Sequence, residues 1–226
     1  MSAKGIDSSR RRSRPVKKKS PFEKKEVKMG GLLIVAIAII ASVAIYINMN
    51  AEEKENPIAV IDTSMGTIKV ELYEDKVPNT CDNFIKLAND GFYDGLVFHR
   101  VANLIPDKPE THIIQGGGFT ADGTPKESPY GPIDLEIDPE VRHVDGTIAM
   151  ARTSDPNSAT SQFYICDGAQ SFLDDNYAAF GIVIDGMDVV RGIASVTTGT
   201  KTLPSDQQMQ YWPIDNVIIN SITIEN

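Results

Sequence analysis

Residues 58–73 read IAVIDTSMGTIKVELY, two apolar-rich runs separated by a short polar turn. In the second run Ile68, Val70 and Leu72 alternate with Lys69 and Glu71. Alternation with a period of two is typical of a β-strand that buries one face and exposes the other to water. The stretch therefore predicts an antiparallel β-hairpin at the start of a mainly β domain.

Further short runs of the same kind follow along the chain. They predict strands at VFHRVA (97–102), HIIQG (112–116), TIAMAR (147–152), QFYIC (162–166), AAFGIVI (178–184) and NVIINSITIE (216–225). Residues 80–89 have helical spacing with Asn79 as a cap, and a second helix is expected after a cap at Asp185. Many short strands with two helices favour a closed antiparallel barrel or a sandwich, and the pattern alone leaves both open.

An uncharged segment precedes this domain. Residues 30–47 run for 18 positions without a charged side chain, long enough as a helix to cover most of the roughly 30 Å hydrocarbon core of a bilayer. We expect a transmembrane helix over residues 30–48. The alternative is a cleaved signal peptide, although such peptides have a short basic lead and an apolar region of about 7–15 residues. Here 29 residues come before the segment.

Charge is distributed unevenly about this segment. Residues 1–50 hold 11 basic and 3 acidic side chains, a net +8, and the remainder holds 11 and 28, a net −17, within a total of −9. Basic residues remain on the cytoplasmic side of single spans. We therefore expect a basic, disordered cytoplasmic tail (1–29), a linker (49–57) and an extracytoplasmic domain (58–226) on a single-pass protein of the cell membrane. Beside a spanning segment, the basic run is expected to contact lipid and not nucleic acid.

Several kinds of chemistry lack support in the sequence. Gly116-Gly117-Gly118 opens no helix, so it is not a phosphate-binding loop, and no Ser or Cys occupies a nucleophile signature. The three histidines lack metal-ligand spacing, and two cysteines do not make a disulfide framework. We expect no metal and no cofactor.

Four groups of residues resemble the cyclophilin family of peptidyl-prolyl cis-trans isomerases, in the family's order and near its spacing, over about residues 58–225. They are Phe98-His99-Arg100; Ile114-Gln115-Gly116-Gly117; Met150-Ala151-Arg152-Thr153 continued by Ser161-Gln162-Phe163-Tyr164-Ile165; and Phe172-Leu173-Asp174 leading to Phe180-Gly181. The resemblance implies a closed eight-stranded antiparallel β-barrel with a helix across each end. It also implies an enzyme that speeds X-Pro isomerisation in folding proteins. The alternative is a non-catalytic module that binds Pro-containing segments at the membrane.

The resemblance also implies a site on the outer wall of the barrel. Arg100 is the expected catalytic residue, because a fixed guanidinium can donate to the amide as its resonance is lost. Gln115 and Gln162 are expected to hold Arg100 and the substrate backbone. The remaining expected substrate-binding positions are the backbone at Ala151 and Arg152, Phe98 as a frame, Ile113, Tyr164 and Leu173 as walls of a proline pocket, His112 and Tyr177 at its edge, and Phe172.

The sequence departs from the family pattern in places that border this site. The stretch between Arg100 and Gln115 is 14 residues, longer than usual in the family, and His112 stands where Phe is usual. Phe172 occupies a position that is Trp in the members best known for tight cyclosporin binding. We therefore expect a reshaped groove and weak binding of cyclosporin.

Overall fold

The computed structural model describes residues 31, 33–43, 46, 55–105, 108 and 111–225. The chain divides into two units, Met1–Lys54 and Glu55–Asn226. The described residues of the first unit are helical. Among the described residues, no helix combines the length and the apolar character needed to cross a membrane. The expected tail, and parts of the expected spanning segment and linker, lie outside the described residues.

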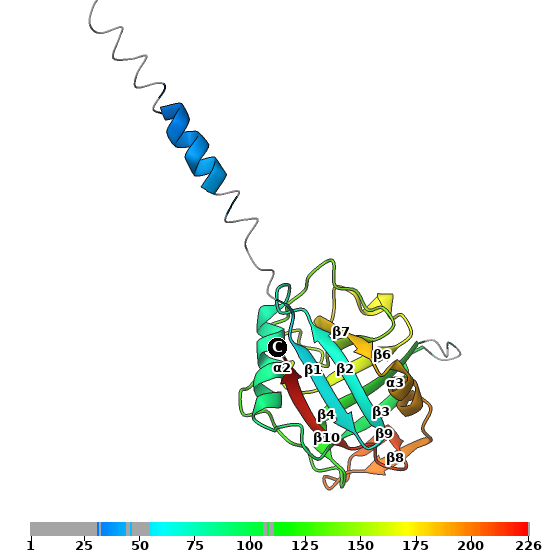
Figure 1. Ribbon diagram of the computed structural model, residues 1–226. Helices are drawn as coiled ribbons and strands as arrows, with labels where there is room; N and C mark the ends of the chain where they lie inside the picture. The colour runs from blue at the N-terminus through cyan, green and yellow to red at the C-terminus, as the bar shows by residue number, and fades with distance from the viewer. Residues whose placement is uncertain are drawn as a thin grey trace, which may run out of the picture. The chain divides into compact units, whose positions relative to one another are not determined.

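The second unit is built on an eight-stranded antiparallel sheet that curls on itself (Figure 1). In order across the sheet its strands are β10 (Ile219–Glu225), β1 (Ile58–Thr63), β2 (Gly66–Leu72), β7 (Ala179–Asp185), β5 (Thr147–Met150), β6 (Phe163–Asp167), β4 (His112–Thr120) and β3 (Leu96–Asn103). At the edges of the sheet, the N–H groups of Gly95 and Phe98 donate to the carbonyls of Ile219 and Val217, at 2.9 and 3.0 Å. The prediction of a mainly β, eight-stranded antiparallel fold is confirmed.

The inside of the curled sheet is filled with side chains. Five aromatic rings lie at its centre, and Phe84 contacts Tyr93, Phe163 and Phe180 with centroid distances of 5.3, 5.5 and 5.2 Å. Phe98 completes the group through an edge contact with Phe163. Because interiors packed in this way leave no room for a ligand, a binding site on this sheet has to lie on its outer face.

Two helices complete the core. Helix α2 (Pro78–Asn89) buries Phe84 and Leu87, and α3 (Met187–Ala194) buries Val190 and Ile193. Both predicted caps were wrong. Helix α2 begins at Pro78, and the Glu136 carboxylate accepts hydrogen bonds from N–H groups of its first turn. Helix α3 follows Gly186, with no side-chain cap from Asp185. Local pattern could not reveal Glu136, because it is 57 residues from its first partner.

A second, two-stranded sheet was not predicted. Strands β8 (Thr198–Thr202) and β9 (Gln208–Pro213) pair beside the β3 end of the large sheet. Trp212 and Leu203 from this hairpin pack with Phe119 and Val97 in a separate buried cluster. The strands lack a regular alternation, and Tyr211 has a φ of 62°. Tertiary packing, and not strand pattern, therefore fixes this hairpin.

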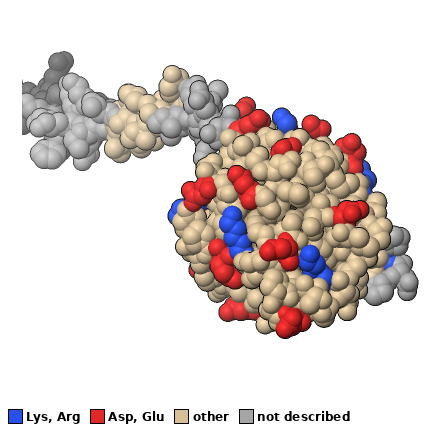
Figure 2. Space-filling model, turned by 90° about the horizontal axis from the view of Figure 1, so that it is seen from below, with Lys and Arg blue, Asp and Glu red and all other residues tan. Residues whose placement is uncertain are grey.

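The surface of the second unit is strongly acidic, as the net charge after residue 50 requires. Acidic side chains are spread over one face of this unit, with few basic ones among them (Figure 2). An arginine without a carboxylate partner on such an acidic surface is therefore a candidate for ligand binding.

Candidate active site

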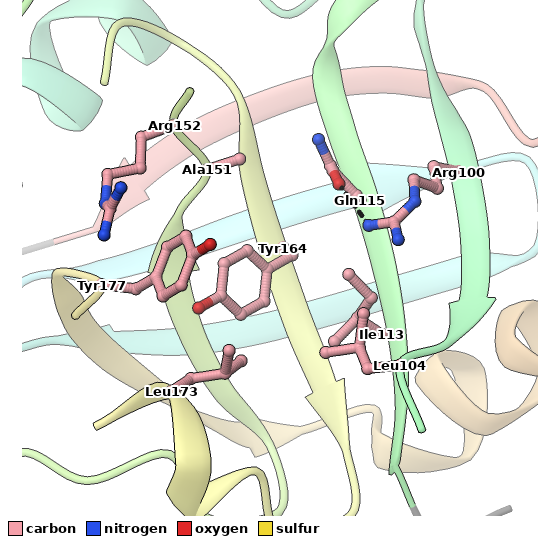
Figure 3. Close-up of a pocket in the computed structure, with 9 residues that line it drawn as sticks. All are labelled: Arg100, Leu104, Ile113, Gln115, Ala151, Arg152, Tyr164, Leu173 and Tyr177. Carbon is pink, nitrogen blue, oxygen red and sulfur yellow. Dashed lines mark hydrogen bonds between the residues drawn. The ribbon is translucent and has the colours of Figure 1, made fainter. Parts of the chain in front are cut away.

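A cavity of about 130 Å³ lies on the outer face of the large sheet, where β3, β4 and β6 run side by side (Figure 3). Nine residues line it: Arg100, Leu104, Ile113, Gln115, Ala151, Arg152, Tyr164, Leu173 and Tyr177. Eight of the nine are positions expected from the sequence, and Leu104 is the addition. Strand register explains the grouping, because Arg100 pairs with Gln115 across β3 and β4, and Gln115 pairs with Tyr164 across β4 and β6.

One side of the cavity is a row of polar side chains. The Arg100 Nη1 donates to Gln115 Oε1 at 3.2 Å, and Gln115 Nε2 donates to Gln162 Oε1 at 3.1 Å. Gln162 lines an adjoining cavity of about 180 Å³, which Gln115 and Arg152 also border. The row holds the guanidinium in the wall of the first cavity, and Gln115 borders both cavities.

Arg100 places a positive charge on the polar side of the cavity. Burial lowers the pKa of Arg100, but a guanidinium stays protonated at any physiological pH. None of the carboxylates in the described residues forms an ion pair with it. Gln115 takes one of its five N–H donors, which leaves others for a ligand in the cavity.

The other side of the cavity is apolar. Ile113, Leu173, Tyr164 and Tyr177 belong to a small apolar cluster on the outside of the sheet, and the two tyrosine rings meet edge to face at 6.1 Å. Leu104 joins this cluster from the long β3–β4 connection, where its N–H donates to the Thr111 carbonyl at 2.9 Å. The sequence offered no periodic signal for Leu104, because it lies in the inserted stretch.

Arg152 closes the end of the cavity opposite Arg100 (Figure 3). Its guanidinium lies 4.5 Å from the centre of the Tyr177 ring and donates to the carbonyls of Asn176 and Thr153. Within the described part of the chain, the main-chain N–H and C=O of Arg152 make no hydrogen bond to other backbone groups. An extended peptide could therefore pair with them.

Three expected substrate-binding residues do not line this cavity. Phe98 is fully buried in the core, because irregularities on both sides of it in β3 shift the strand, so that Phe98 and Arg100 face opposite ways. His112 precedes Ile113 in β4, so strand alternation turns it to the other face. Phe172 lies in the short helix η2 (Ser171–Leu173) and is 48% exposed.

Two residues behind the apolar side were not singled out from the sequence as site residues. The His143 ring bonds Tyr164 OH through Nε2 and Asp174 Oδ1 through Nδ1, both at 3.0 Å. No local pattern signals contacts between residues 21 and 31 positions apart. Among the described residues, no group of three or more His, Cys, Asp or Glu side chains is arranged to hold a metal ion.

Comparisons with known proteins agree with this geometry. The family described as cyclophilin type peptidyl-prolyl cis-trans isomerase matches residues 58–224. A peptidyl-prolyl cis-trans isomerase of Acinetobacter baylyi is 39% identical over 86% of this chain and 94% of its own. Peptidyl-prolyl cis-trans isomerase B of Escherichia coli is 37% identical over 72% of this chain and 96% of its own.

Solved structures give the same result. A crystal structure of a Cryptosporidium parvum cyclophilin type peptidyl-prolyl cis-trans isomerase, in the presence of the dipeptide Ala-Pro, is 32% identical. It aligns with a TM-score of 0.63 over 75% of this chain and 99% of its own. The order of the motifs, the eight-stranded sheet and these matches agree. The chain therefore belongs to the cyclophilin type of peptidyl-prolyl cis-trans isomerases.

Proposed function

We propose that this peptidyl-prolyl cis-trans isomerase binds the proline ring of a protein substrate in the apolar part of the groove and rotates the X-Pro bond beside Arg100. The observation that carries the proposal is the Arg100–Gln115–Gln162 row. At the border of a cavity of about 130 Å³, it holds a guanidinium that forms no ion pair with any carboxylate of the described residues. The reaction needs no cofactor, because no covalent bond is broken.

The reaction requires selective stabilisation of a twisted amide. Amide resonance gives a rotation barrier of about 18–20 kcal/mol, and unaided X-Pro isomerisation takes tens to hundreds of seconds. As the bond twists, the lone pair returns to the prolyl nitrogen, which becomes a hydrogen-bond acceptor. A donor fixed beside that nitrogen binds the twisted state more strongly than either planar state, and this lowers the barrier. Arg100 is that donor.

The rest of the groove orients the substrate. Ile113, Tyr164 and Leu173 pack against the proline ring, which has no N–H of its own to satisfy. The main-chain groups of Arg152 pair with the residue before proline, which favours an extended backbone. Gln162 binds a substrate carbonyl near the adjoining cavity.

A prolyl isomerisation assay on the full chain tests the proposal. The wild-type protein is expected to accelerate isomerisation of an Ala-Pro peptide, and Arg100→Ala to lower kcat/KM by about 10²–10³, the cost of removing a fixed donor of this kind. Arg191→Ala is the matched control, because Arg191 is an exposed arginine that bonds Asp145 away from the groove. An inactive, folded wild-type protein, or an Arg100→Ala variant with full activity, would contradict the proposal.

The same chain is tethered to a membrane by residues 30–48, with its N-terminus in the cytoplasm and its catalytic domain on the other side. The uncharged run, the basic flank and the outward-facing apolar side chains of described helical residues such as Leu33, Ile34 and Ile40 support this part of the proposal. Membrane fractions washed with carbonate are expected to retain the full chain. Its release would contradict the tether, and a mature chain beginning after residue 44, detected by mass spectrometry, would favour a cleaved leader instead.

Cyclosporin binds this protein weakly. Phe172 supports this part of the proposal, because its ring is exposed beside the groove and lacks the N–H donor of tryptophan. Phe172→Trp is expected to tighten inhibition about tenfold, the worth of one hydrogen bond. Equal inhibition of the two proteins in the isomerase assay would contradict this assignment.

A further inference from the structure

A buried hydrogen-bonded chain lies behind the proline pocket. The Tyr164 ring forms the pocket wall and is 3% exposed, and its hydroxyl lies 3.0 Å from Nε2 of His143. The other ring nitrogen, Nδ1, lies 3.0 Å from Oδ1 of Asp174. The main-chain N–H of His143 donates to the same Asp174 oxygen at 2.8 Å. The wall of the pocket is therefore connected through one histidine to a carboxylate.

The direction of each hydrogen bond follows from the acceptor at the end of the chain. An ionised carboxylate can only accept, so His143 Nδ1–H donates to Asp174, and the unprotonated Nε2 accepts the Tyr164 hydroxyl proton. Burial lowers the pKa of His143, although the Asp174 carboxylate opposes this shift. Because the net shift is downward, the ring is neutral at pH 7. Burial alone would raise the pKa of Asp174, but the hydrogen bonds from His143 outweigh it and lower that pKa.

Asp174 also fixes the segment that carries two other pocket walls. It directly follows Leu173, and the N–H groups of Asn176 and Tyr177 donate back to the Leu173 carbonyl at 3.2 and 3.3 Å. Arg142 Nη1 lies 3.5 Å from Asp174 Oδ2 on the outer side. Leu173, Tyr177 and Tyr164 are thus tied to one histidine–carboxylate pair, although they come from two separate segments of the chain.

We propose that His143 and Asp174 act as positioning residues for the proline pocket. They set the Tyr164 ring through its hydroxyl and the Leu173–Tyr177 segment through the carboxylate, so that the three apolar walls keep the spacing that a proline ring needs. A ring wall held only by packing could tilt, whereas a hydroxyl bonded to a fixed acceptor limits tilt. This inference rests on the proposed function of the groove, and it concerns substrate affinity and not the twisting step.

Kinetics on the full chain can separate positioning from a merely structural role. His143→Leu leaves the hydroxyl without its acceptor and is expected to raise both KM for an Ala-Pro peptide and Kd for the Ala-Pro dipeptide about tenfold, with kcat changed less than threefold. Tyr164→Phe keeps the ring and removes the hydroxyl, with an expected rise of about fivefold. If His143 acts through this hydroxyl, the double variant resembles His143→Leu alone, and the two effects do not multiply.

Each outcome decides a different question. Unchanged KM in a folded His143→Leu protein, or single effects that multiply in the double variant, would overturn the positioning role. If His143→Leu does not fold, Tyr164→Phe decides, because a KM equal to that of wild type would overturn the role of the hydroxyl. A wild-type protein that neither binds Ala-Pro nor isomerises the peptide would instead defeat the proposed function itself.

Discussion

The two halves of the groove are held in place in different ways. In the polar half, Arg100, Gln115 and Gln162 bond one another directly, side chain to side chain, at the surface of the sheet. In the apolar half, the walls have few polar atoms, and a buried network behind them supplies the hydrogen bonds. Polar side chains within a site can fix each other's orientation by hydrogen bonds, whereas apolar side chains have to be held by packing and by hydrogen-bonded groups behind them. Substitutions in the polar half should therefore alter the rate of bond rotation, and substitutions in the apolar half should alter substrate affinity.

A buried histidine stands behind each half, and the two differ in their partners. His143 bonds through both ring nitrogens. His99 lies against the rings of Phe119 and Trp212, and its Nδ1 has no hydrogen-bond partner among the described residues. Burial lowers the pKa of His99 to about 4, and the Arg100 charge lowers it further, against smaller opposing effects of Val97 and Gln162. His99, which lies behind the polar half, therefore has fewer hydrogen-bond partners among the described residues than His143 behind the apolar half.

The largest expected effect is a loss of stability in acid to which the burial of His99 contributes. The folded state resists protonation until about pH 4, whereas an unfolded histidine takes up a proton near pH 6.5. The contribution of His99 to stability is therefore full above pH 6.5 and declines as the pH falls, by on the order of 3 kcal/mol at pH 4. Denaturant unfolding at several pH values, followed by the fluorescence of the single tryptophan Trp212, measures the decline.

Variants at the two histidines separate their contributions to the acid loss of stability. His99→Gln is expected to flatten the pH dependence between 6.5 and 4 more than His143→Gln does, because the Asp174 carboxylate offsets part of the burial effect on His143. A steeper curve after His99→Gln, or no change, would show that the acid loss originates elsewhere.

The next effect concerns the polar half. Gln115→Leu keeps the size of the side chain but removes the bonds to both Arg100 and Gln162. A hydrogen bond to a charged group contributes about 1.5–3 kcal/mol, so kcat/KM is expected to fall about 30-fold, mostly in kcat. Gln208→Leu serves as control, since Gln208 is exposed and bonds only Thr202 on the β8–β9 hairpin among the described residues. If Gln115→Leu changes only KM, the polar half contributes to substrate binding and not to bond rotation, which would contradict the separate roles of the two halves.

The sequence predicted β1 and β2 because they bury alternate residues, and the other strands of the large sheet because they are short apolar runs between turn residues. It predicted most of the groove through the family resemblance. Both depend on local order along the chain. Phe98 was misplaced because two irregularities in β3 interrupt the alternation that relates it to Arg100. The β8–β9 hairpin was missed because Trp212 and its contacts, and not an alternating pattern, stabilise it.

The other features that the sequence did not predict depend on contacts between segments far apart in the chain. Glu136 at the start of α2 and His143 behind Tyr164 act on residues far along the chain. Neither has a motif of its own, since one glutamate or one histidine in a loop has many possible partners. Leu104 lines the groove from an inserted stretch that has no periodic pattern in the sequence.

The smallest effect tests the apolar half directly. Leu173 lines the cavity beside Tyr164 and Tyr177, and Leu173→Ala removes part of the surface that packs on the proline ring. Because such packing is similar in the planar and twisted states, it contributes to binding more than to rotation. We expect KM for an Ala-Pro peptide to rise about fivefold with kcat within twofold, which corresponds to roughly 1 kcal/mol of lost contact. Ile214→Ala, at an exposed position on another cavity, is the control. If Leu173→Ala lowers kcat as strongly as Gln115→Leu, the walls take part in twisting the bond, and the two halves act as a single catalytic unit.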